Sequence, residues 1–479
     1  MVLGYYFIIA ILIIAGLFFT RSPRGHIALL ILFNALQWGI TVFEYTHMHV
    51  ESLGFFKADA IAVIMLVVLS ILSSTSSFHS ISYLKHHHRN HTTPQRAQAI
   101  YFAGLCLLIM AQTGAFLAGH IGVTWVFVEI TTFAATLLIY HERSEEAIEA
   151  SWKYLFICSV SLTLAFMGIL LLGISAQEAG ASNLSYESLT LHANSLNSFW
   201  LKLAFLLILI GYSAKMGIFP MHTATVDAHT VAPPPVSAFI STTLMNVGFI
   251  GIYRMYAVIA HTSSSAWANH VLLIAGVLSV FVAVVYLIRV KHFKRMFAYS
   301  SLENMGLVAI GLGVGGPAYY AAILHLIFHS FTKASMFYQI QQVHQVFKSY
   351  LIKNTGGYFR HYLPGAMVML ISFICIAGIP PSGIFISEFL LIKAMFGAKM
   401  YIILIVVLLL LTFAVWAIGK NFMQLIFSDP DGSGEIQPDK ISPIHSLSQF
   451  ILLGLVIYLG INPSHQMVDL INEAIKILP

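Results

Sequence analysis

Residues 211–235 read GYSAKMGIFPMHTATVDAHTVAPPP, and they interrupt an apolar run, 199–219, that is otherwise long enough to cross a bilayer. The run contains a lysine, Lys215, and Gly217 and Pro220 follow at once. Because proline lacks an N–H and clashes with the preceding turn, we expect the helix to break there. Backbone that is broken at membrane depth is tolerated only where protein or a water-filled cavity satisfies its polar groups. A lysine beside such a break predicts a functional site; the alternative is a lysine whose amine extends to the membrane interface.

The composition is that of a polytopic membrane protein. Of the 479 residues, 58% are hydrophobic and 9% are charged, whereas a soluble domain carries about 25% charged residues. The first apolar run, 3–19, lacks the basic segment and cleavage site of a secretory signal, so we expect a first spanning helix. Cys106, Cys158 and Cys375 lie far apart, which supports neither disulfides nor an iron–sulfur site. The chain also lacks a Walker loop and a dinucleotide fingerprint, so ATP-driven transport and nicotinamide chemistry lose their usual support.

Apolar runs of spanning length predict an all-α membrane fold with about fourteen transmembrane helices. The runs lie at 3–19, 27–43, 58–78, 100–119, 121–140, 153–173, 199–219, 235–259, 269–289, 296–314, 318–346, 364–398 (interrupted), 400–427 and 444–461. We divide the chain into an N-terminal three-helix segment (1–99), two five-helix repeats (100–260 and 261–428) and a C-terminal loop with the last helix (429–479).

Basic side chains indicate the orientation of the chain in the membrane. They gather in four predicted loops, each of which follows an odd-numbered helix: Arg21 and Arg24; Lys85, Arg89 and Arg96; Arg289, Lys291, Lys294 and Arg295; and Lys348, Lys353 and Arg360. Since basic loops stay on the cytoplasmic side, we expect both termini to face outward from a bacterial or archaeal cytoplasmic membrane.

We interpret the segment with His86, His87, His88 and His91 as a solvated basic loop rather than a metal site.

A second broken helix occupies the corresponding place in the second half. The run 364–398 contains GIPPSGIFISEFLLIKA, in which a carboxylate, Glu388, follows the predicted helix-breaking residues Pro380, Pro381 and Gly383. The tripeptide Gly-Ile-Phe occurs in both breaks, at 217–219 and 383–385. Interrupted helices in corresponding halves indicate a transporter built from repeats, with its site near the membrane midplane.

Titratable side chains inside the predicted helices mark a candidate ion path. His325, His329 and Lys333 recur every four residues, so they share one helix face. Imidazole titrates near neutral pH, and charge is costly in a bilayer, so we interpret this face as part of a proton or ion relay. Three further groups complete the predicted relay: Glu129, Lys215 and Glu388. Movement of the Glu129 charge relative to Lys215 would let the lysine take up or release a proton.

Six other polar residues are candidate relay or supporting groups: Lys153, His222, Asp227, His229, Asn246 and Glu303. Lys153 is interpreted equally as an interface anchor or as a proton entry group. Asp227 and His229 follow the first break, where they either orient the loop or form a cytoplasmic entry. Arg254, near the end of a predicted helix, is interpreted as structural.

Five segments resemble the antiporter-like proton-pumping subunits of respiratory complex I and its relatives, which include membrane-bound NiFe hydrogenases, formate hydrogenlyases and multisubunit Na⁺/H⁺ antiporters. The segments are KMGIFPMHTATVDAHTVAPPPVSA, WVFVEITTFAATLLI, KRMFAYSSLENMGLVAIGLG, ILHLIFHSFTKASMF and GIPPSGIFISEFLLIKA. The resemblance implies fourteen helices, two inverted five-helix repeats and a hydrophilic central axis. It also implies carrier roles for Glu129, Lys215, the group on 318–346 and, as the terminal carrier, Glu388.

Departures from the family pattern indicate a subfamily. Asn246 stands where many complex I pumping subunits have a lysine, which puts the connecting proton carrier in doubt; His325 or water would substitute. Together with the glutamate of AYSSLEN and the phrase PPSGIFISEF, this asparagine looks more like the component F type found in hydrogenase-4 and formate hydrogenlyase complexes.

These observations favour a proton-translocating membrane subunit of a redox-driven assembly. The chain itself is expected to carry no redox chemistry, cofactor or metal; iron–sulfur, NiFe, flavin or molybdenum centres would belong to partner subunits. Its expected partners are other membrane subunits, a soluble redox module and the lipid bilayer, but not nucleic acid. The alternatives are a subunit of a Na⁺/H⁺ antiporter or of an inorganic-carbon uptake complex, and a non-pumping anchor for a soluble redox arm.

Overall fold

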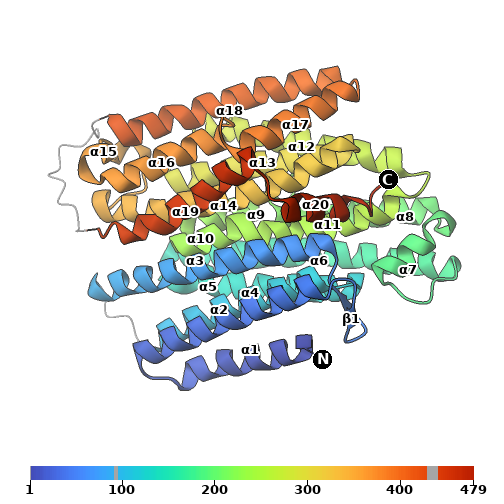
Figure 1. Ribbon diagram of the computed structural model, residues 1–479, viewed down its shortest axis with the longest axis horizontal. Helices are drawn as coiled ribbons and strands as arrows, with labels where there is room; N and C mark the ends of the chain where they lie inside the picture. Colours follow the sequence, from blue (N-terminus) through green and yellow to red (C-terminus); the bar gives the residue numbers. More distant parts are fainter. Residues whose placement is uncertain (1, 91–94, 429–440) are drawn as a thin grey trace.

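A computed structural model describes residues 2–90, 95–428 and 441–479 of the chain (Figure 1). Its helices lie side by side along the long axis of the molecule. Both termini lie towards the end that carries the β1–β2 hairpin and α7, and α15 lies at the opposite end. The two termini therefore share one end, as expected, and the assignment of that end to the outer face stays a prediction.

The fold is helical throughout, apart from one short hairpin. The hairpin pairs β1 (Glu51–Ser52) with β2 (Phe56–Lys57) in antiparallel fashion. The α-helices are α1 (Val2–Phe19), α2 (Pro23–Thr46), α3 (Ala60–Asn90), α4 (Gln95–Leu117), α5 (Ile121–Ile139), α6 (Glu145–Glu178), α7 (Tyr186–Leu191), α8 (Ser198–Met216), α9 (Thr223–Val231), α10 (Pro234–Phe239), α11 (Met245–Ala260), α12 (Ser265–Leu287), α13 (Phe293–Val314), α14 (Pro317–Phe347), α15 (Tyr358–His361), α16 (Leu363–Ile376), α17 (Gly383–Gly397), α18 (Tyr401–Phe427), α19 (Ile444–Ile461) and α20 (His465–Ile475).

Within the described ranges, eleven helical stretches are long and apolar enough to cross a membrane, and α16 is a shorter apolar helix. The multi-pass membrane fold is thereby confirmed, whereas the number of about fourteen spans stays a prediction. α13 and α14 fall outside the eleven. They are the helices that carry many of the buried polar side chains, which lower their hydropathy while placing polar groups in the centre of the protein.

Both predicted helix breaks are present. α8 ends at Met216, and Gly217 adopts a left-handed conformation (φ 72°) that favours glycine. The chain resumes as α9, which the sequence did not predict. The second break separates α16 from α17, whose first turn is capped by the Ser382 hydroxyl accepting from the Phe385 N–H (3.2 Å).

Several boundaries differ from the predictions. The run predicted as one helix at 235–259 is interrupted by a π-helical turn at Ile240–Leu244 between α10 and α11. α3 continues to Asn90, so 86–88 are helical rather than part of a flexible loop, and His91 lies outside the described residues. Lys294, predicted to lie in a basic loop, is buried in the first turn of α13. Apolar periodicity could not show this, because the basic pair at 294–295 has the composition of a loop.

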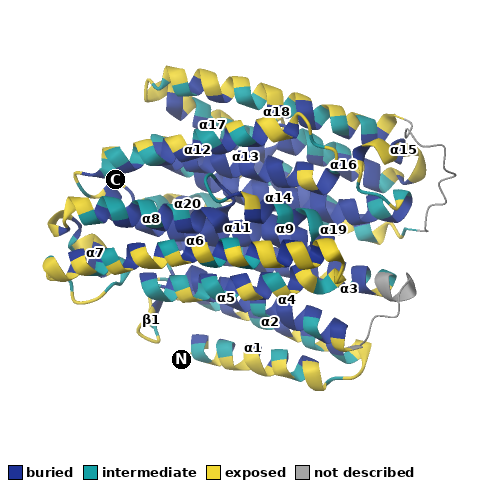
Figure 2. Ribbon diagram, turned by 180° about the vertical axis from the view of Figure 1, so that it is seen from behind, coloured by how far each residue is buried: buried dark blue, intermediate teal, exposed yellow. Residues whose placement is uncertain are grey.

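Figure 2 shows that buried residues dominate the central helices, whereas the outer helices are largely exposed on one side. Every residue of α10, the π-helical turn and α11 is buried, as are most residues of α13 and α14. α1 and α18 instead expose many large apolar side chains along their outer faces. This arrangement suits a lipid environment, in which polar groups are costly unless they face the protein interior.

Consecutive helices of the two predicted repeats pack in the same order. In the first, α4, α5, α6, α8 and α11 form a chain of neighbours; in the second, α12 packs on α13, α13 on α14, and α14 on both halves of the second broken helix. α14 also contacts α10, which joins the two sets. The domain boundaries at 99/100, 260/261 and 428/429 stay a prediction.

Candidate functional site

Lys215 occupies the last turn of α8, directly before the first break, and its side chain is 1% exposed. Its Nζ donates a hydrogen bond to the Tyr154 hydroxyl (2.9 Å) and lies 4.9 Å from the centre of the same ring. The backbone of α11 approaches closely because Gly248 has no side chain: a Cβ there would overlap the backbone of Lys215 and Met216. The lysine is therefore held by α6 and enclosed by α11, and its amine lies inside the protein.

Glu129, on α5, is half-buried and does not form an ion pair with Lys215 among the described residues. Its carboxylate accepts a hydrogen bond from the Ser159 hydroxyl (3.0 Å), and Thr132 lies at the 3.5 Å limit for a second. Glu129 is still close enough to act on Lys215 electrostatically. Since Ser159 and Tyr154 both belong to α6, this helix binds each member of the predicted pair and keeps the two charges apart.

The three residues at intervals of four on α14 are all buried, and one of them links three helices. His325 contacts the Ser387 hydroxyl on α17 through Nδ1 (2.9 Å) and the Asn304 side-chain oxygen on α13 through Nε2 (3.0 Å). Lys333 donates from Nζ to the Phe297 carbonyl on α13 (3.0 Å). Both ring nitrogens of the third residue, His329, lack a hydrogen-bond partner within the described chain, although Lys333 and His325 act on it electrostatically.

The carboxylates of the second half lie on α13 and α17, two helices that pack against α14. Glu303 is buried on α13, where it accepts from the Asn304 amide (3.3 Å) and interacts electrostatically with Lys333. Glu388, on α17, packs its carboxylate against the backbone of the second break. A Cβ at Gly378 would overlap the Glu388 carboxylate, so the missing side chain there makes room for the predicted terminal carrier.

The region after the first break contributes a buried histidine and a surface ion pair. The ring of His229 is buried, approaches the Ser237 carbonyl through Nδ1 (3.3 Å) and stacks on Phe337 of α14 (5.5 Å between ring centres). Asp227 instead forms an ion pair with Arg295 at the start of α13 (2.9 Å), where both side chains are partly exposed. The sequence suggested the same possible roles for Asp227 and His229, but the structure places them in different environments.

Three further candidate supporting residues, Lys153, His222 and Asn246, do not hydrogen-bond to Lys215 or Lys333 within the described chain. Lys153 is exposed and pairs with Glu149 one turn earlier on α6 (2.5 Å), a position that suits an interface anchor. His222 lies at the first break beside the ring of Phe219. Asn246, on α11, donates to the Ser330 hydroxyl of α14 (3.2 Å), so it bridges the two halves.

Four side chains of the site were not predicted from the sequence. Tyr154, Asn304 and Ser387 contact predicted relay residues. Lys294 is a further buried lysine. Tyr154 and Ser387 are single polar residues in apolar helices, a pattern that also fits structural hydrogen bonding. Lys294 is buried, and its Nζ donates to the Ala232 carbonyl (2.5 Å) and lies 5.2 Å from the centre of the Tyr350 ring.

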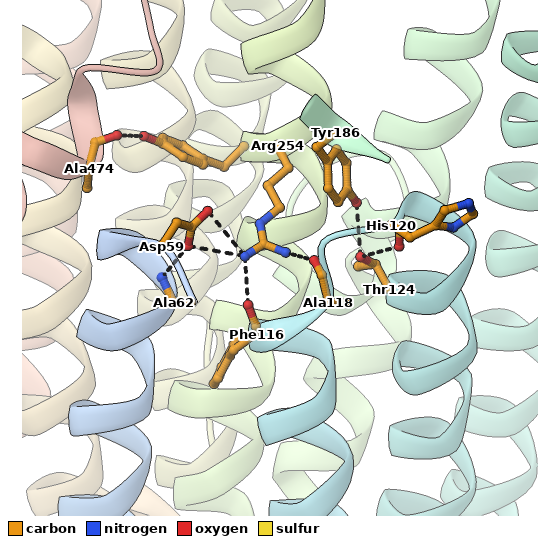
Figure 3. A network of polar contacts seen from close by, with 10 residues as sticks. Asp59, Ala62, Phe116, Ala118, His120, Thr124, Tyr186, Arg254 and Ala474 are labelled. Carbon is orange, nitrogen blue, oxygen red and sulfur yellow. Dashed lines mark hydrogen bonds and ion pairs between the residues drawn. The ribbon is translucent and has the colours of Figure 1, made fainter. Parts of the chain in front are cut away.

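Arg254 forms a separate network at the end of the molecule that carries α7 (Figure 3). Its guanidinium donates to the carbonyl of Phe116 at the end of α4 (2.7 Å) and to that of Ala118 just beyond it, and pairs with Asp59 (3.2 Å). Asp59 also accepts from the Ala62 N–H in the first turn of α3 (2.9 Å). One arginine thus satisfies the end of one helix and ties it to the start of another, in agreement with the structural role expected for it.

The described ranges contain no group of three or more His, Cys, Asp or Glu side chains that could hold a metal ion. The buried polar groups are instead spread along α6, α8, α13, α14 and α17, a geometry that suits the passage of a proton between neighbours better than the coordination of one ion.

Comparisons with known proteins agree with this architecture. A family model described as "NADH:quinone oxidoreductase/Mrp antiporter, TM" matches residues 118–413. The chain is 31% identical over 410 residues to a hydrogenase-4 component F homolog of Methylacidiphilum infernorum, covering 84% of each protein. It superimposes with a TM-score of 0.86 on a chain of the Mrp complex from Dietzia sp., at 17% identity and with 99% of this chain and 97% of that one covered. A chain of an archaeal membrane-bound sulfane sulfur reductase gives a TM-score of 0.84 at 21% identity, with 100% and 96% covered.

Proposed function

Because this chain belongs to the NADH:quinone oxidoreductase/Mrp antiporter family, we propose that it translocates protons as one membrane subunit of a redox-driven assembly. It is an antiporter-like membrane subunit of the superfamily that includes complex I, membrane-bound hydrogenases and Mrp antiporters. The proposal concerns what the family leaves open, namely the ion, the driving reaction and the residues on the path.

The observation that carries the proposal is the row of buried titratable side chains through the centre of the protein. Lys215 begins it beside the first break, the face of α14 continues it, and Glu388, which is partly buried, ends it beside the second break. A charge at the bilayer centre costs at least about 2.5–3.5 kcal/mol. The free-energy cost of burying these groups would bring no benefit to a purely structural helix bundle. A proton path, in contrast, requires titratable groups inside the membrane.

Hydrogen bonds around His325 are suited to the transfer of a proton. The Ser387 hydroxyl has one proton and two acceptors within reach, the His325 Nδ1 (2.9 Å) and the Ile384 carbonyl (2.8 Å). When the ring holds a proton on both nitrogens, it donates to Ser387 and to the Asn304 oxygen, while Ser387 donates to Ile384. Either protonation state thus finds partners after rotation of one hydroxyl, so a proton can leave towards α17 and its carboxylate, Glu388.

The relatives suggest which assembly the chain serves. The hydrogenase-4 component F homolog favours an energy-converting hydrogenase or a formate-hydrogenlyase-like complex. A soluble module would then hold the redox centres, other membrane subunits would flank this chain, and its basic loops would face the cytoplasm. The structural likeness to the Mrp complex supports the alternative, a Na⁺/H⁺ antiporter subunit that works without redox chemistry.

The test is proton uptake by vesicles that contain the whole native complex, supplied with the electron donor and acceptor of the co-purifying subunits. Lys215→Ala and Lys333→Ala should each abolish proton uptake while the same subunits still co-purify. Lys202→Ala is the matched control, because this lysine lies near the start of α8 beside the Trp267 ring (6.0 Å) and outside the row, and it should leave uptake unchanged.

The same experiment separates the alternatives. Electron transfer that proceeds without any proton movement in the unmodified complex would indicate a membrane anchor. Proton movement that requires a Na⁺ gradient and no electron donor would indicate the antiporter. Uptake that survives both lysine substitutions would refute the proposed path.

A further inference from the structure

A cavity of about 340 Å³ opens at the end of the molecule that carries the basic loops. Its walls come from α3, the turn at Tyr140–Glu142, the α9–α10 junction, α13 and α14. Titratable side chains contribute much of this wall: Tyr83, His86, Glu142, Lys294, His344, Lys348 and Tyr350. The volume has room for several water molecules, and polar walls of this kind keep water in place.

Lys294 connects this cavity to the buried interior. It lines the cavity although its side chain is 2% exposed, and its Nζ donates to the Ala232 carbonyl at the end of α9. The carboxylate of Glu142 lies across the cavity, accepts a hydrogen bond from Tyr83 and acts on Lys294 electrostatically. A proton drawn in by the Glu142 carboxylate would thus reach the Lys294 amine through cavity water.

His229 is linked to Lys294 through Ser237 and the Ala232 carbonyl. The Ser237 hydroxyl donates to the same Ala232 carbonyl (3.0 Å), and the Ser237 carbonyl faces the His229 Nδ1 (3.3 Å). Since a carbonyl only accepts, neutral His229 carries its proton on Nδ1 and leaves Nε2 as a bare acceptor. That Nε2 is buried and has no hydrogen-bond partner in the described part of the chain.

His229 in turn borders the row on α14. Its ring stacks on Phe337, one helical turn beyond Lys333, and both Lys294 and Lys333 are close enough to act on it electrostatically. A buried acceptor without a partner, within electrostatic reach of two buried lysines, has no evident structural use. It is suited to accept a proton from one lysine and return it to the other.

We propose that this cavity is a site of proton entry, in which Lys294 takes up the proton and His229 passes it to Lys333. The inference rests on the proposed function and extends it: Lys294 loads the second half of the protein while Lys215 loads the first, and net uptake requires both halves to be loaded. The step moves one proton and no electrons. Cavity water protonates the Lys294 amine, the ammonium donates to the His229 Nε2, and the resulting imidazolium releases that proton towards the Lys333 amine.

The first experiment compares two replacements of Lys294 in vesicles with the whole complex. Lys294→Met removes the charge, whereas Lys294→Arg keeps both the charge and a donor for Ala232 but does not release a proton at any accessible pH. A structural or anion-binding lysine would be rescued by arginine. For the proposed role, both variants should reduce the rate of proton uptake at least tenfold while the subunits remain associated, and normal uptake by Lys294→Arg would overturn the proposal.

The second experiment tests water access without any change to the buried groups. The three native cysteines are all buried, so a new cysteine in the cavity stands out. Thr230→Cys, in the cavity wall, should react with a membrane-impermeant thiol reagent only from the side of the basic loops, and the reaction should block uptake. Thr190→Cys, in a cavity at the opposite end, should react only from the other side. Failure of Thr230→Cys to react, or reaction without any block, would overturn the entry site.

Failure of this inference differs from failure of the proposed function. If Lys333→Ala stops uptake while Lys294→Arg and labelled Thr230→Cys do not, the row is a proton path and its entry lies elsewhere. If Lys333→Ala has no effect either, the proposed function fails together with the entry site.

Discussion

Tyr154→Phe removes one oxygen atom from the partner of Lys215 and leaves the ring, with its contact to the amine at 4.9 Å, in place. A hydrogen bond to a charged group contributes about 1.5–3 kcal/mol. If the protonated form of Lys215 loses this contribution, its population falls by about tenfold to about 150-fold, since each 1.36 kcal/mol is a factor of ten. We therefore expect proton uptake by the native complex to slow within this range, without loss of assembly.

The assay is the initial rate of proton uptake per electron transferred, measured in vesicles with equal amounts of complex. Tyr212→Phe is the matched control: Tyr212 is equally buried, lies one turn from Lys215 on α8, and its hydroxyl has no partner among the described residues. The control should behave as the unmodified protein. Equal rates for the two phenylalanine variants would refute the reasoning, because the effect would then not depend on the hydrogen bond to Lys215.

Three further predictions concern stability and packing. Arg254→Leu should destabilise the purified chain by about 1–3 kcal/mol, because the carbonyls of Phe116 and Ala118 lose their donor and the half-buried Asp59 loses its ion-pair partner, and thermal unfolding measures the loss. Burial, and then nearby basic side chains, lower the pKa of His292 from 6.5 to about 4; the unfolded chain therefore binds more protons between these values, so stability falls as pH drops from 6.5 to 4. His292→Gln should flatten that part of the stability curve. Gly248→Val should force α11 away from α8 and reduce proton uptake.

Each of these predictions has a control. Arg254→Lys keeps the charge but not the forked donors, so it should lose less than the leucine variant; an equal loss would argue against the ion pair. A pH profile that is unchanged by His292→Gln would assign the acid sensitivity to other groups. Gly454→Val, at a glycine with open space around it, should have no effect, and an equal effect of both valine variants would refute the packing argument.

The breaks and the polar face of α14 were predictable because each depends on local chemistry. Proline and glycine interrupt a helix wherever it lies, so Pro220 and Pro381 marked both breaks. Residues four apart share a helix face in any fold, which placed His325 and Lys333 together. The exact helix ends were less predictable, since α9 and the π-helical turn before α11 depend on what the surrounding helices satisfy.

The partners of the charged groups could not be predicted, because they come from distant parts of the chain. Tyr154 meets Lys215 across 61 residues, and Ser387 meets His325 across 62. Glu129 and Lys215 each form a separate hydrogen bond to α6, and the sequence did not predict either bond. For Lys294 the signal was misleading, since a basic pair before an apolar run indicates a loop whether or not tertiary packing covers it.

Asn246 explains why the second half of the protein would need its own proton entry at Lys294. A neutral amide does not titrate, so the bond from Asn246 to Ser330 joins the two halves mechanically without carrying a proton between them. A chain with this asparagine needs either ordered water at that point or a supply of protons that reaches α14 directly. The cavity lined by Lys294 provides the second solution, because both Lys294 and Lys333 act electrostatically on His229. Lys215 and Lys294 would then load protons into different halves of the protein. The two proton paths would meet at α14, which contacts helices of both halves.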